Sequence, residues 1–262
     1  MDIVRYGKNV LRYRSFSTEK IKRVRDTEWA ALAKSNRPIL AKTREGFDIF
    51  VNPRDKAISR SIWVRGTYFQ EDVTRVFKSV LARGDVVVDV GANVGWYALL
   101  AARRARRVFA FEPDPTSAAL LHKSVQHGAF KNVEINEACV SDSDGGATLW
   151  KSDTFDGDNS IVRHTGRESI RVRSVTLDEC FQDETIDLLK VDAQGAEPLI
   201  FKGAKRMIEE GRIRSVVLEW DPRYWSPEFR TLLLAFDVYD VQGRILSEMP
   251  PQKTDVLLRL RV

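Results

Sequence analysis

Residues 86–95 read VVVDVGANVG, and this stretch decides the fold. The run VVVDV (86–90) is typical of a strand that is buried on both faces of a parallel sheet. Gly91 and Gly95 then allow a tight turn and a close approach of the backbone to a ligand. A helix is expected to begin at once, at Trp96, and its unpaired N–H groups can face that ligand.

Strands and helices alternate along the chain after this stretch. The further strands expected are 107–112, 133–140, 186–192 and 214–220, and the helices expected between them are 96–104, 115–127 and 197–210. Two short strands are expected at 147–151 and 170–175. Residues 236–242 and 255–260 are expected to form a closing antiparallel pair. Such alternation predicts an α/β protein with a doubly wound, mostly parallel sheet.

The region before residue 68 has a different character. It predicts a basic helix at about 18–35 and short strands over 37–65 around turn-forming residues, and a helix over 71–81 follows it. We therefore divide the chain into a basic N-terminal arm with short strands (1–67) and a main domain (68–262).

Composition sets broad limits. The chain has 262 residues, of which 43% are hydrophobic and 30% charged, which excludes collagen, low-complexity disorder and a coiled-coil rod. No apolar run is long enough to cross a bilayer, and the N-terminus lacks the apolar core of a signal peptide. Cys139 and Cys180 fit a reducing compartment and have no zinc-site spacing, so we expect a cytoplasmic protein without a metal.

Positive charge is concentrated at the start of the chain. Residues 1–44 contain 12 basic and 4 acidic residues, whereas the whole chain carries a net charge of +5. The arm could contact a polyanion or a membrane surface. The alternative is a solvated amphipathic helix with basic edges.

The end of the second strand indicates which ligand the glycine loop accepts. Glu112 lies 21 residues beyond Gly91, the spacing at which a carboxylate can bind the two hydroxyls of a ribose. A dinucleotide loop would follow G-x-G-x-x-G, but Asn93 occupies the position of its second glycine. Asp89 would repel a pyrophosphate and attract an ammonium or sulfonium. These residues favour S-adenosylmethionine (SAM) over NAD.

Four motifs together resemble the FkbM-type family of class I SAM-dependent methyltransferases: DVGANVG (89–95), AFEP (110–113), TLDE (176–179) and LLKVDAQGAE (188–197). GTYFQED (66–72) resembles the segment that precedes the first strand in that family, so the likeness spans residues 45–220. The resemblance implies a Rossmann-like sheet of seven strands with the last one antiparallel. It also implies SAM as methyl donor and hydroxyl groups of natural products or sugars as acceptors.

The resemblance assigns cofactor roles to individual residues. The methionine side of SAM would bind the loop formed by Asp89, Gly91, Asn93 and Gly95, and Glu112 would hold the ribose.

After the third strand, Ala138 would border the adenine and Asp142 would pair with its amino group. The chain departs from the family at Gln194, where the family usually has glutamate; this puts in doubt any role that needs a second charge there.

Three residues near the end of the fourth strand are candidates for the transfer step. Asp192 can act as the base that removes a hydroxyl proton, or it can brace a loop. Lys190 shares a strand face with Asp192 and can pair with it or orient substrate, or it can extend to the rim of the sheet. Glu197 can be catalytic or can interact with the helix dipole. Glu219 and His164 are weaker candidates, for the cleft wall and a substrate contact respectively.

Two other functions compete with O-methylation. The basic arm would suit a nucleic-acid methyltransferase, but residues 192–195 read DAQG where enzymes that methylate flipped-out adenine usually carry N/D-P-P-aromatic. A degenerate methyltransferase fold could instead serve as a polyanion-binding module through residues 1–44. The complete cofactor loop and both carboxylates weigh against that alternative.

Overall fold

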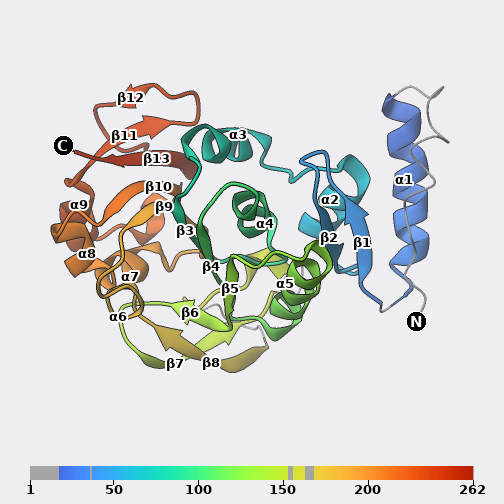
Figure 1. Cartoon of the computed structure of the whole chain (residues 1–262), viewed down its shortest axis with the longest axis horizontal. Helices are drawn as coiled ribbons and strands as arrows, with labels where there is room; N and C mark the ends of the chain where they lie inside the picture. The colour runs from blue at the N-terminus through green and yellow to red at the C-terminus, as the bar shows by residue number, and fades with distance from the viewer. Residues whose placement is uncertain (1–17, 36, 153–155, 163–167, 262) are drawn as a thin grey trace.

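The computed structural model describes residues 18–35, 37–152, 156–162 and 168–261 and has a central sheet of eight strands (Figure 1). In spatial order they are β12 (Ile245–Leu246), β11 (Phe236–Asp240), β13 (Thr254–Leu260), β10 (Ile213–Trp220), β9 (Ile186–Val191), β3 (Val86–Val90), β4 (Arg107–Phe111) and β5 (Val133–Asn136). Neighbouring strands from β10 to β5 are parallel, and β13 is antiparallel to β10 and β11. This confirms the mostly parallel α/β fold with an antiparallel last strand, and the short β12 makes eight strands instead of the expected seven.

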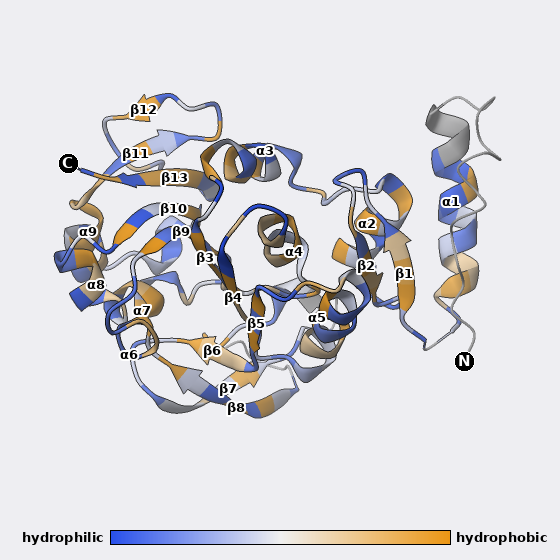
Figure 2. Ribbon diagram, viewed as in Figure 1, coloured by the Kyte–Doolittle hydropathy of each residue, from blue (hydrophilic) through white to orange (hydrophobic). Residues whose placement is uncertain are grey.

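Helices cover both faces of this sheet, which explains why its central strands are apolar throughout. One layer consists of α3 (Glu71–Val80), α4 (Trp96–Ala102) and α5 (Pro115–Gly128), and the other of α6 (Leu177–Cys180), α7 (Glu197–Lys202), α8 (Lys205–Glu209) and α9 (Pro227–Leu233). Val87 packs toward the first layer, and Val86 and Val88 pack toward the second. Figure 2 shows the resulting concentration of hydrophobic residues along β3 and β4.

The N-terminal elements pack against the first helix layer. They are α1 (Thr18–Leu32), the antiparallel pair β1 (Ile39–Lys42) and β2 (Asp48–Val51), and α2 (Ile58–Arg65). The amide of Phe50 donates a hydrogen bond to Ser124 Oγ of α5 at 2.8 Å. The expected helix near 18–35 is confirmed, but the expectation of strands is wrong for 58–65. The Asp55 carboxylate accepts hydrogen bonds from the amides of Ala57 and Ser59, which favours the first turn of a helix.

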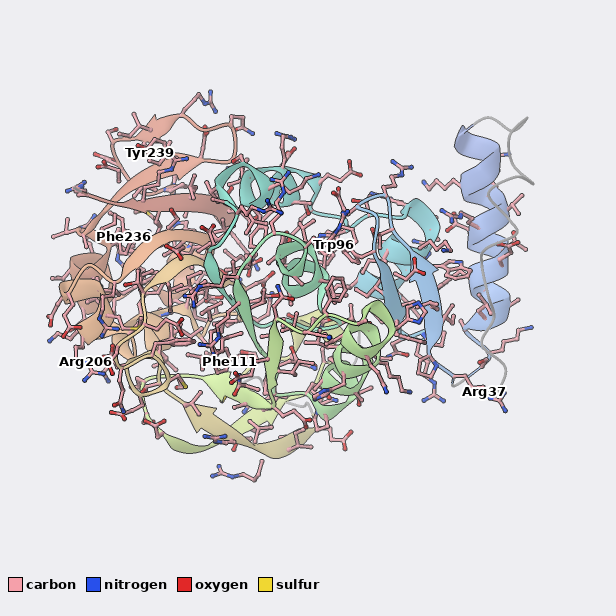
Figure 3. The ribbon with its side chains drawn as sticks, viewed as in Figure 1. Arg37, Trp96, Phe111, Arg206, Phe236 and Tyr239 are labelled. Carbon is pink, nitrogen blue, oxygen red and sulfur yellow. The ribbon has the colours of Figure 1, made fainter. Side chains whose placement is uncertain are left out.

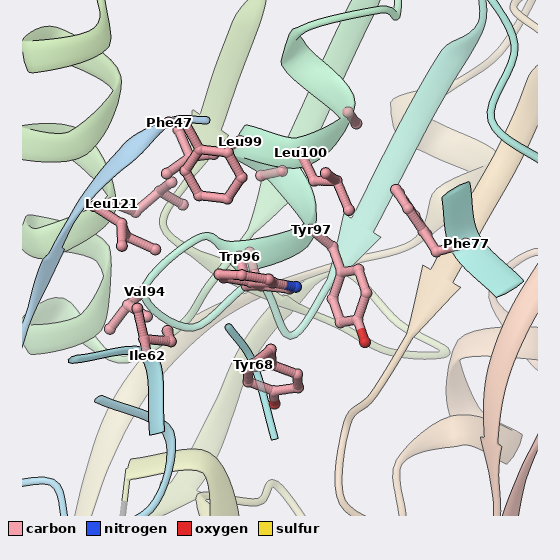
Figure 4. Close-up of a cluster of buried hydrophobic side chains, with 14 of the residues drawn as sticks. Phe47, Ile62, Tyr68, Phe77, Val94, Trp96, Tyr97, Leu99, Leu100 and Leu121 are labelled. Atoms are coloured by element: carbon pink, nitrogen blue, oxygen red, sulfur yellow. The ribbon is translucent and has the colours of Figure 1, made fainter. Parts of the chain in front are cut away.

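A hydrophobic cluster connects these elements to the rest of the chain. The Trp96 ring lies 5.3 Å from that of Phe47 and 5.9 Å from that of Tyr68 (Figure 4). In Figure 3, Trp96 lies between α4 and the N-terminal strands, whereas Phe111 lies in the central sheet. This cluster crosses residue 67, and the domain boundary that we place there remains a prediction.

The expected third strand, 133–140, is two strands in two sheets. β5 ends at Asn136, and β6 (Ala138–Val140) pairs with β8 (Ser169–Val175), which also pairs with β7 (Gly145–Trp150). The side chains of β5 are at most half-buried, whereas those of β6 are fully buried. The two segments therefore have different packing partners, which their β-forming composition did not reveal.

The expected helix 197–210 is also divided, into α7 and α8. The carbonyl of Gly203 accepts a hydrogen bond from the amide of Asp178 at 2.9 Å, which removes it from the helical ladder. A Cβ at position 203 would lie 2.0 Å from the carbonyl oxygen of Ser141, so the chains touch here. None of the helices in the described part of the chain has the length and apolar character that a membrane span requires.

Candidate active site

The loop after β3 is shaped by close backbone contact. Gly91 has a φ of +79°, and a Cβ there would lie 2.0 Å from the carbonyl oxygen of Asp192. Only glycine meets both demands. Asn93 also has a positive φ, of 51°, which asparagine tolerates better than most residues, and its Oδ1 accepts from the amide of Val94. Gly95 precedes α4 with a φ of 100°.

A solvent-open cavity lies at the carboxyl ends of β3, β4 and β9 in this part of the fold. Its lining includes Val90, Gly91, Asn93, Phe111, Glu112, Pro113, Ala138, Cys139, Val140, Gly157, Asn159, Ser160, Ile161, Asp192, Ala193 and Gln194, together with Ile58 of α2 and Tyr68, which precedes α3. Two lining side chains, Glu112 and Asp192, are acidic. No lysine, arginine or histidine is among the lining residues in the described part of the chain.

Glu112 connects the ends of β3 and β4. Its Oε2 accepts from the amide of Asn93 at 2.7 Å, and its Oε1 accepts from the amide of Asp114 at 2.8 Å. Burial raises its pKa to about 8, although these two hydrogen bonds act in the opposite direction. Each carboxylate oxygen retains a second lone pair, so the residue can still accept hydrogen bonds from a ligand.

Asp89 lies at the floor of a smaller adjoining cavity. That cavity is also lined by Tyr68, Tyr97 and Asp192. Asp89 is 1% exposed, and its Oδ2 has no hydrogen-bond partner among the described residues. Burial raises the pKa of Asp89 to about 7, and the charge of Lys190 limits the increase. A buried carboxylate oxygen without a donor is suited to a cationic ligand.

Asp192 is the candidate base that does reach the cavity. Its Oδ1 accepts from Gln194 Nε2 at 2.8 Å, and its Oδ2 lies 3.6 Å from Lys190 Nζ. Lys190 is fully buried and does not extend to the rim of the sheet. Burial acts to lower the pKa of Lys190, but attraction from Asp192, Asp255, Asp89 and Glu219 raises it above its ordinary value. Its ammonium therefore remains charged beside Asp192.

Glu197 points into its own loop. Its two oxygens accept from the amides of Ala193 (3.0 Å) and Gly195 (2.9 Å). It is 3% exposed and is not among the residues that line the cavity, and burial raises its pKa to about 6. The structure therefore brings Asp192 and Lys190 together. The contacts of Glu197 brace the loop that leads from Asp192 to α7.

The adenine side of the predicted site is only partly assembled. Ala138, Cys139 and Val140 line the cavity, but Asp142 does not. The Asp142 carboxylate accepts from Lys202 Nζ at 2.7 Å, and this contact lowers its pKa. Asp142 is thus bound to α7, away from the cavity lining.

Individual residues of the segment around Asn159 were not singled out in the sequence. Asn159 Nδ2 donates to Asp114 Oδ2 at 2.8 Å, and Lys151 Nζ donates to the same oxygen at 2.6 Å. Ser160 Oγ donates to the carbonyl of Gln194 at 2.8 Å. These bonds bring residues 157–161 against the cavity. Only the E-P-D-P turn at 112–115 hints at them in the sequence, since Asp114 caps α5 through the amide of Thr116.

The remaining candidates are not part of the cavity lining. Glu219 pairs with Lys253 at 2.9 Å, and burial raises its pKa to about 8. Two histidines that were not candidates, His122 and His127, are exposed and lie beside Glu137 and Asp48, respectively.

His164 lies outside the described residues. No group of three or more histidine, cysteine, aspartate and glutamate side chains with metal-site geometry occurs in the ranges that the structure describes.

The strand order, the antiparallel β13 and the glycine loop facing Glu112 define a class I methyltransferase fold. The chain belongs to the FkbM methyltransferase family, since the profile of the Methyltransferase FkbM domain matches residues 89–241, more than half of its length.

Three characterised or named relatives are similar to this chain. "Methyltransferase sdnD" of Sordaria araneosa is 29% identical, over 56% of this chain and 71% of the relative. "2-O-methyltransferase NoeI" of Sinorhizobium fredii is 31% identical, over 53% of this chain and 66% of NoeI. "Hexuronic acid methyltransferase AglP" of Haloferax volcanii is 25% identical, over 77% and 82%. A crystal structure of Methyltransferase FkbM from Methylobacillus flagellatus aligns with a TM-score of 0.49 at 14% identity, over 90% of this chain and 59% of that one.

Proposed function

We propose that this protein transfers a methyl group from SAM to a hydroxyl group of a sugar or natural product. The observation that carries the proposal is the cavity lining, which has two carboxylates and, in the described residues, no basic side chain. A pyrophosphate would face the carboxylate of Asp192 with no basic lining side chain in the described residues, whereas the sulfonium and ammonium of SAM would be attracted. The name of NoeI, a 2-O-methyltransferase, supports a hydroxyl acceptor, and that of AglP, a hexuronic acid methyltransferase, supports a sugar.

The residues present fit SAM. The unpartnered Oδ2 of Asp89 can accept hydrogen bonds from an ammonium group, and the free lone pairs of Glu112 can accept them from the ribose hydroxyls. Gly91 lines the cavity, and its lack of a side chain lets the Asp192 carbonyl approach its backbone closely. Phe111 and the buried residues of β6 supply apolar walls for the adenine.

When bound, SAM supplies an electrophilic methyl group, so the protein must align the acceptor and remove a proton. Alignment at near-attack distance provides much of the acceleration in such displacements. Asp192 is the candidate general base, because it lines both cavities and is held by Lys190 and Gln194. The Lys190 ammonium lies 3.6 Å from Oδ2 of Asp192 and holds this side chain in position. Glu197 keeps the loop in position through its two amide contacts.

The two competing functions make different predictions. A nucleic-acid methyltransferase or a polyanion-binding module would bind RNA or DNA with an affinity that falls steeply with salt. The O-methyltransferase proposed here requires SAM binding and methylation of a purified small acceptor. Cytoplasmic localisation and the contact of residues 1–44 with a polyanion or membrane remain proposals.

The experiment is a methyl-transfer assay with radiolabelled SAM. The wild-type protein is incubated with panels of free sugars, uronic acids, oligosaccharides and hydroxylated natural products, with Asp192→Asn as the catalytic control. We expect label in an alkali-stable methyl ether of one acceptor class and almost none with the variant. SAM binding without transfer to any hydroxyl compound, combined with transfer to RNA, would overturn the proposal in favour of nucleic-acid methylation.

A further inference from the structure

A second hollow lies outside the active-site cavity, between α1 and α2, which are side by side in Figure 1. We call it the α1–α2 groove. Its volume is about 330 Å³. Its walls include Lys22 of α1, Arg60 and Arg65 of α2, Lys56, which precedes α2, and Phe69, which follows it. None of these residues lines the active-site cavity.

Packing between the two helices fixes the walls of this groove. Arg25 Nη1 of α1 donates to the carbonyl oxygen of Val64 at 2.9 Å. The rings of Trp29 and Trp63 lie 6.4 Å apart, and Trp29 is buried. The groove is therefore a feature of the folded chain, made by one element from the basic arm and one that also borders the active site.

The groove carries a positive excess. Asp26 is paired with Arg60 at 2.8 Å, which neutralises one of the basic side chains. Lys22, Lys56 and Arg65 line the groove and have no ion-pair partner within the described ranges. All three are exposed, so their charges can reach an incoming anion. The active-site cavity has the opposite character, because its charged lining residues are carboxylates.

Phe69 adds a flat apolar surface to this charged groove. Three large hydrophobic side chains are exposed in the described residues, and Phe69, at 44%, is the only aromatic one. Its ring lies 4.7 Å from that of Tyr68. An exposed aromatic face beside hydrogen-bonding side chains suits the apolar face of a sugar ring.

At two places in the chain, one residue lines the active-site cavity and its neighbour in sequence lines the groove. Ile58 lines the cavity and its neighbour Ala57 lines the groove; likewise Tyr68 lines the cavity and Phe69 lines the groove. An elongated molecule that presents one end at the cavity would therefore have the groove within its reach.

We infer that the α1–α2 groove binds an acidic oligosaccharide segment of the methyl acceptor, with its carboxylates on Lys22, Lys56 and Arg65 and a sugar ring on Phe69. This inference rests on the proposed function and specifies its substrate. It gives the basic helix α1 a role in holding the acceptor. Exposed charge contacts of this kind are individually weak, so several acting together on a chain of sugars are required for useful affinity.

The test is calorimetric titration of the full chain with trigalacturonate, in the presence of SAM's product S-adenosylhomocysteine. The variants are the double substitution Lys56→Gln/Arg65→Gln and the single substitution Phe69→Ala. The matched control is Arg83→Gln/Lys131→Gln, which removes two exposed charges that do not line the groove. Maltotriose serves as the neutral probe. Circular dichroism and SAM titration show whether each variant is folded.

We expect trigalacturonate to bind the wild type and the control equally, and to bind the groove double variant about three- to tenfold more weakly, since two exposed charge contacts are lost. Phe69→Ala should weaken binding without altering the salt dependence. Equal affinity in wild type and double variant, or equal affinity for maltotriose and trigalacturonate, would overturn the inference. Cosedimentation with phosphatidylglycerol vesicles through Lys56 and Arg65, without trigalacturonate binding, would overturn it in favour of a membrane surface. Failure of the wild type to bind SAM would instead refute the proposed function.

Discussion

Gln194 donates a hydrogen bond from Nε2 to Oδ1 of Asp192 at 2.8 Å, while Lys190 lies 3.6 Å from Oδ2, so each oxygen of this carboxylate has its own partner. Gln194→Glu would replace the donor by a second carboxylate. Two carboxylates at this distance share a proton, and their ionisation is shifted to higher pH. We expect the acidic limb of the kcat–pH profile to move up by about one pH unit, so that turnover at a pH on that limb falls about tenfold.

Gln194→Met is the matched control, since it removes the hydrogen bond and adds no charge. It should lower turnover while leaving the acidic limb where it is. An unchanged pH profile in Gln194→Glu would show that Asp192 is not the titrating base.

Asp192→Asn tests the base directly. Asparagine retains much of the shape and cannot accept the acceptor's proton, so kcat should fall by about 10²–10⁴-fold. The Kd of SAM, measured by calorimetry, should rise far less than kcat falls, because the change removes only the attraction between one carboxylate and the cofactor. Loss of SAM affinity together with turnover would assign Asp192 to the cofactor instead.

The pH dependence of SAM binding should report on Glu112. Its pKa in the free protein is raised to about 8 by burial, so it is largely protonated at pH 7 and ionised at pH 9. The ionised form accepts hydrogen bonds from the ribose on both oxygens, so SAM should bind about tenfold more tightly at pH 9 than at pH 7.

Glu112→Gln should bind SAM more weakly and lose that part of the pH dependence. Asp142→Asn is the matched control: because Asp142 is paired with Lys202, the change should leave both the Kd and its pH dependence within about twofold of wild type. A wild-type Kd that is constant from pH 7 to pH 9 would contradict the role given to Glu112.

Gly91→Ala and Gly84→Ala separate a steric clash from backbone strain. Both glycines have a positive φ, but a Cβ at Gly84 meets nothing within 4 Å, whereas one at Gly91 lies 2.0 Å from the Asp192 carbonyl. Gly84→Ala should lower the free energy of unfolding by about 1–2 kcal/mol and leave SAM binding intact. Gly91→Ala should lower the free energy of unfolding by about 1–3 kcal/mol more than Gly84→Ala does. It should also weaken SAM binding by more than about tenfold, because the new Cβ would push the loop after β3 away from the Asp192 carbonyl. Equal effects at the two positions would be inconsistent with the close contact.

Glu197→Gln distinguishes a bracing carboxylate from a catalytic one. A carboxamide can accept through only one of its two groups, so one of the amides of Ala193 and Gly195 loses its partner. We expect the free energy of unfolding, from urea denaturation, to fall by about 1–3 kcal/mol while kcat falls less than about tenfold. A loss of kcat as large as that of Asp192→Asn would restore Glu197 to the catalytic group.

The cavity at the ends of β3 and β4 could be predicted because its position follows local rules. Three local features indicate it: the valine run of β3, the glycine loop after it, and the spacing from that loop to Glu112. In a parallel sheet, such short stretches at adjacent strand ends lie close together. Asp192 was found for the same reason, since it directly follows β9. The alternation of strands and helices along the chain likewise predicted that helices cover both faces of the sheet.

The parts that were missed depend on contacts between distant segments. Asn159 reaches the site through a hydrogen bond to a residue 45 positions away, and nothing in its own neighbourhood indicates that partner. The separation of β5 from β6 and of α7 from α8 reflects which backbone groups meet in space. Asp142 has the right place in the sequence for the adenine, yet the Lys202 side chain engages it.

The position of β13 has a consequence for how this protein comes into being. Residues 254–260 form β13, which lies between β10 and β11 in the sheet. In a ribosome-bound chain that ends before these residues, β10 and β11 therefore lack the strand that pairs with both of them. Asp255, which sits opposite Glu219 and helps to keep Lys190 charged, arrives with the same segment. Synthesis of β13 therefore completes the electrostatic surroundings of the site in the same step that seals the sheet, and a chain stopped short of it would lack both.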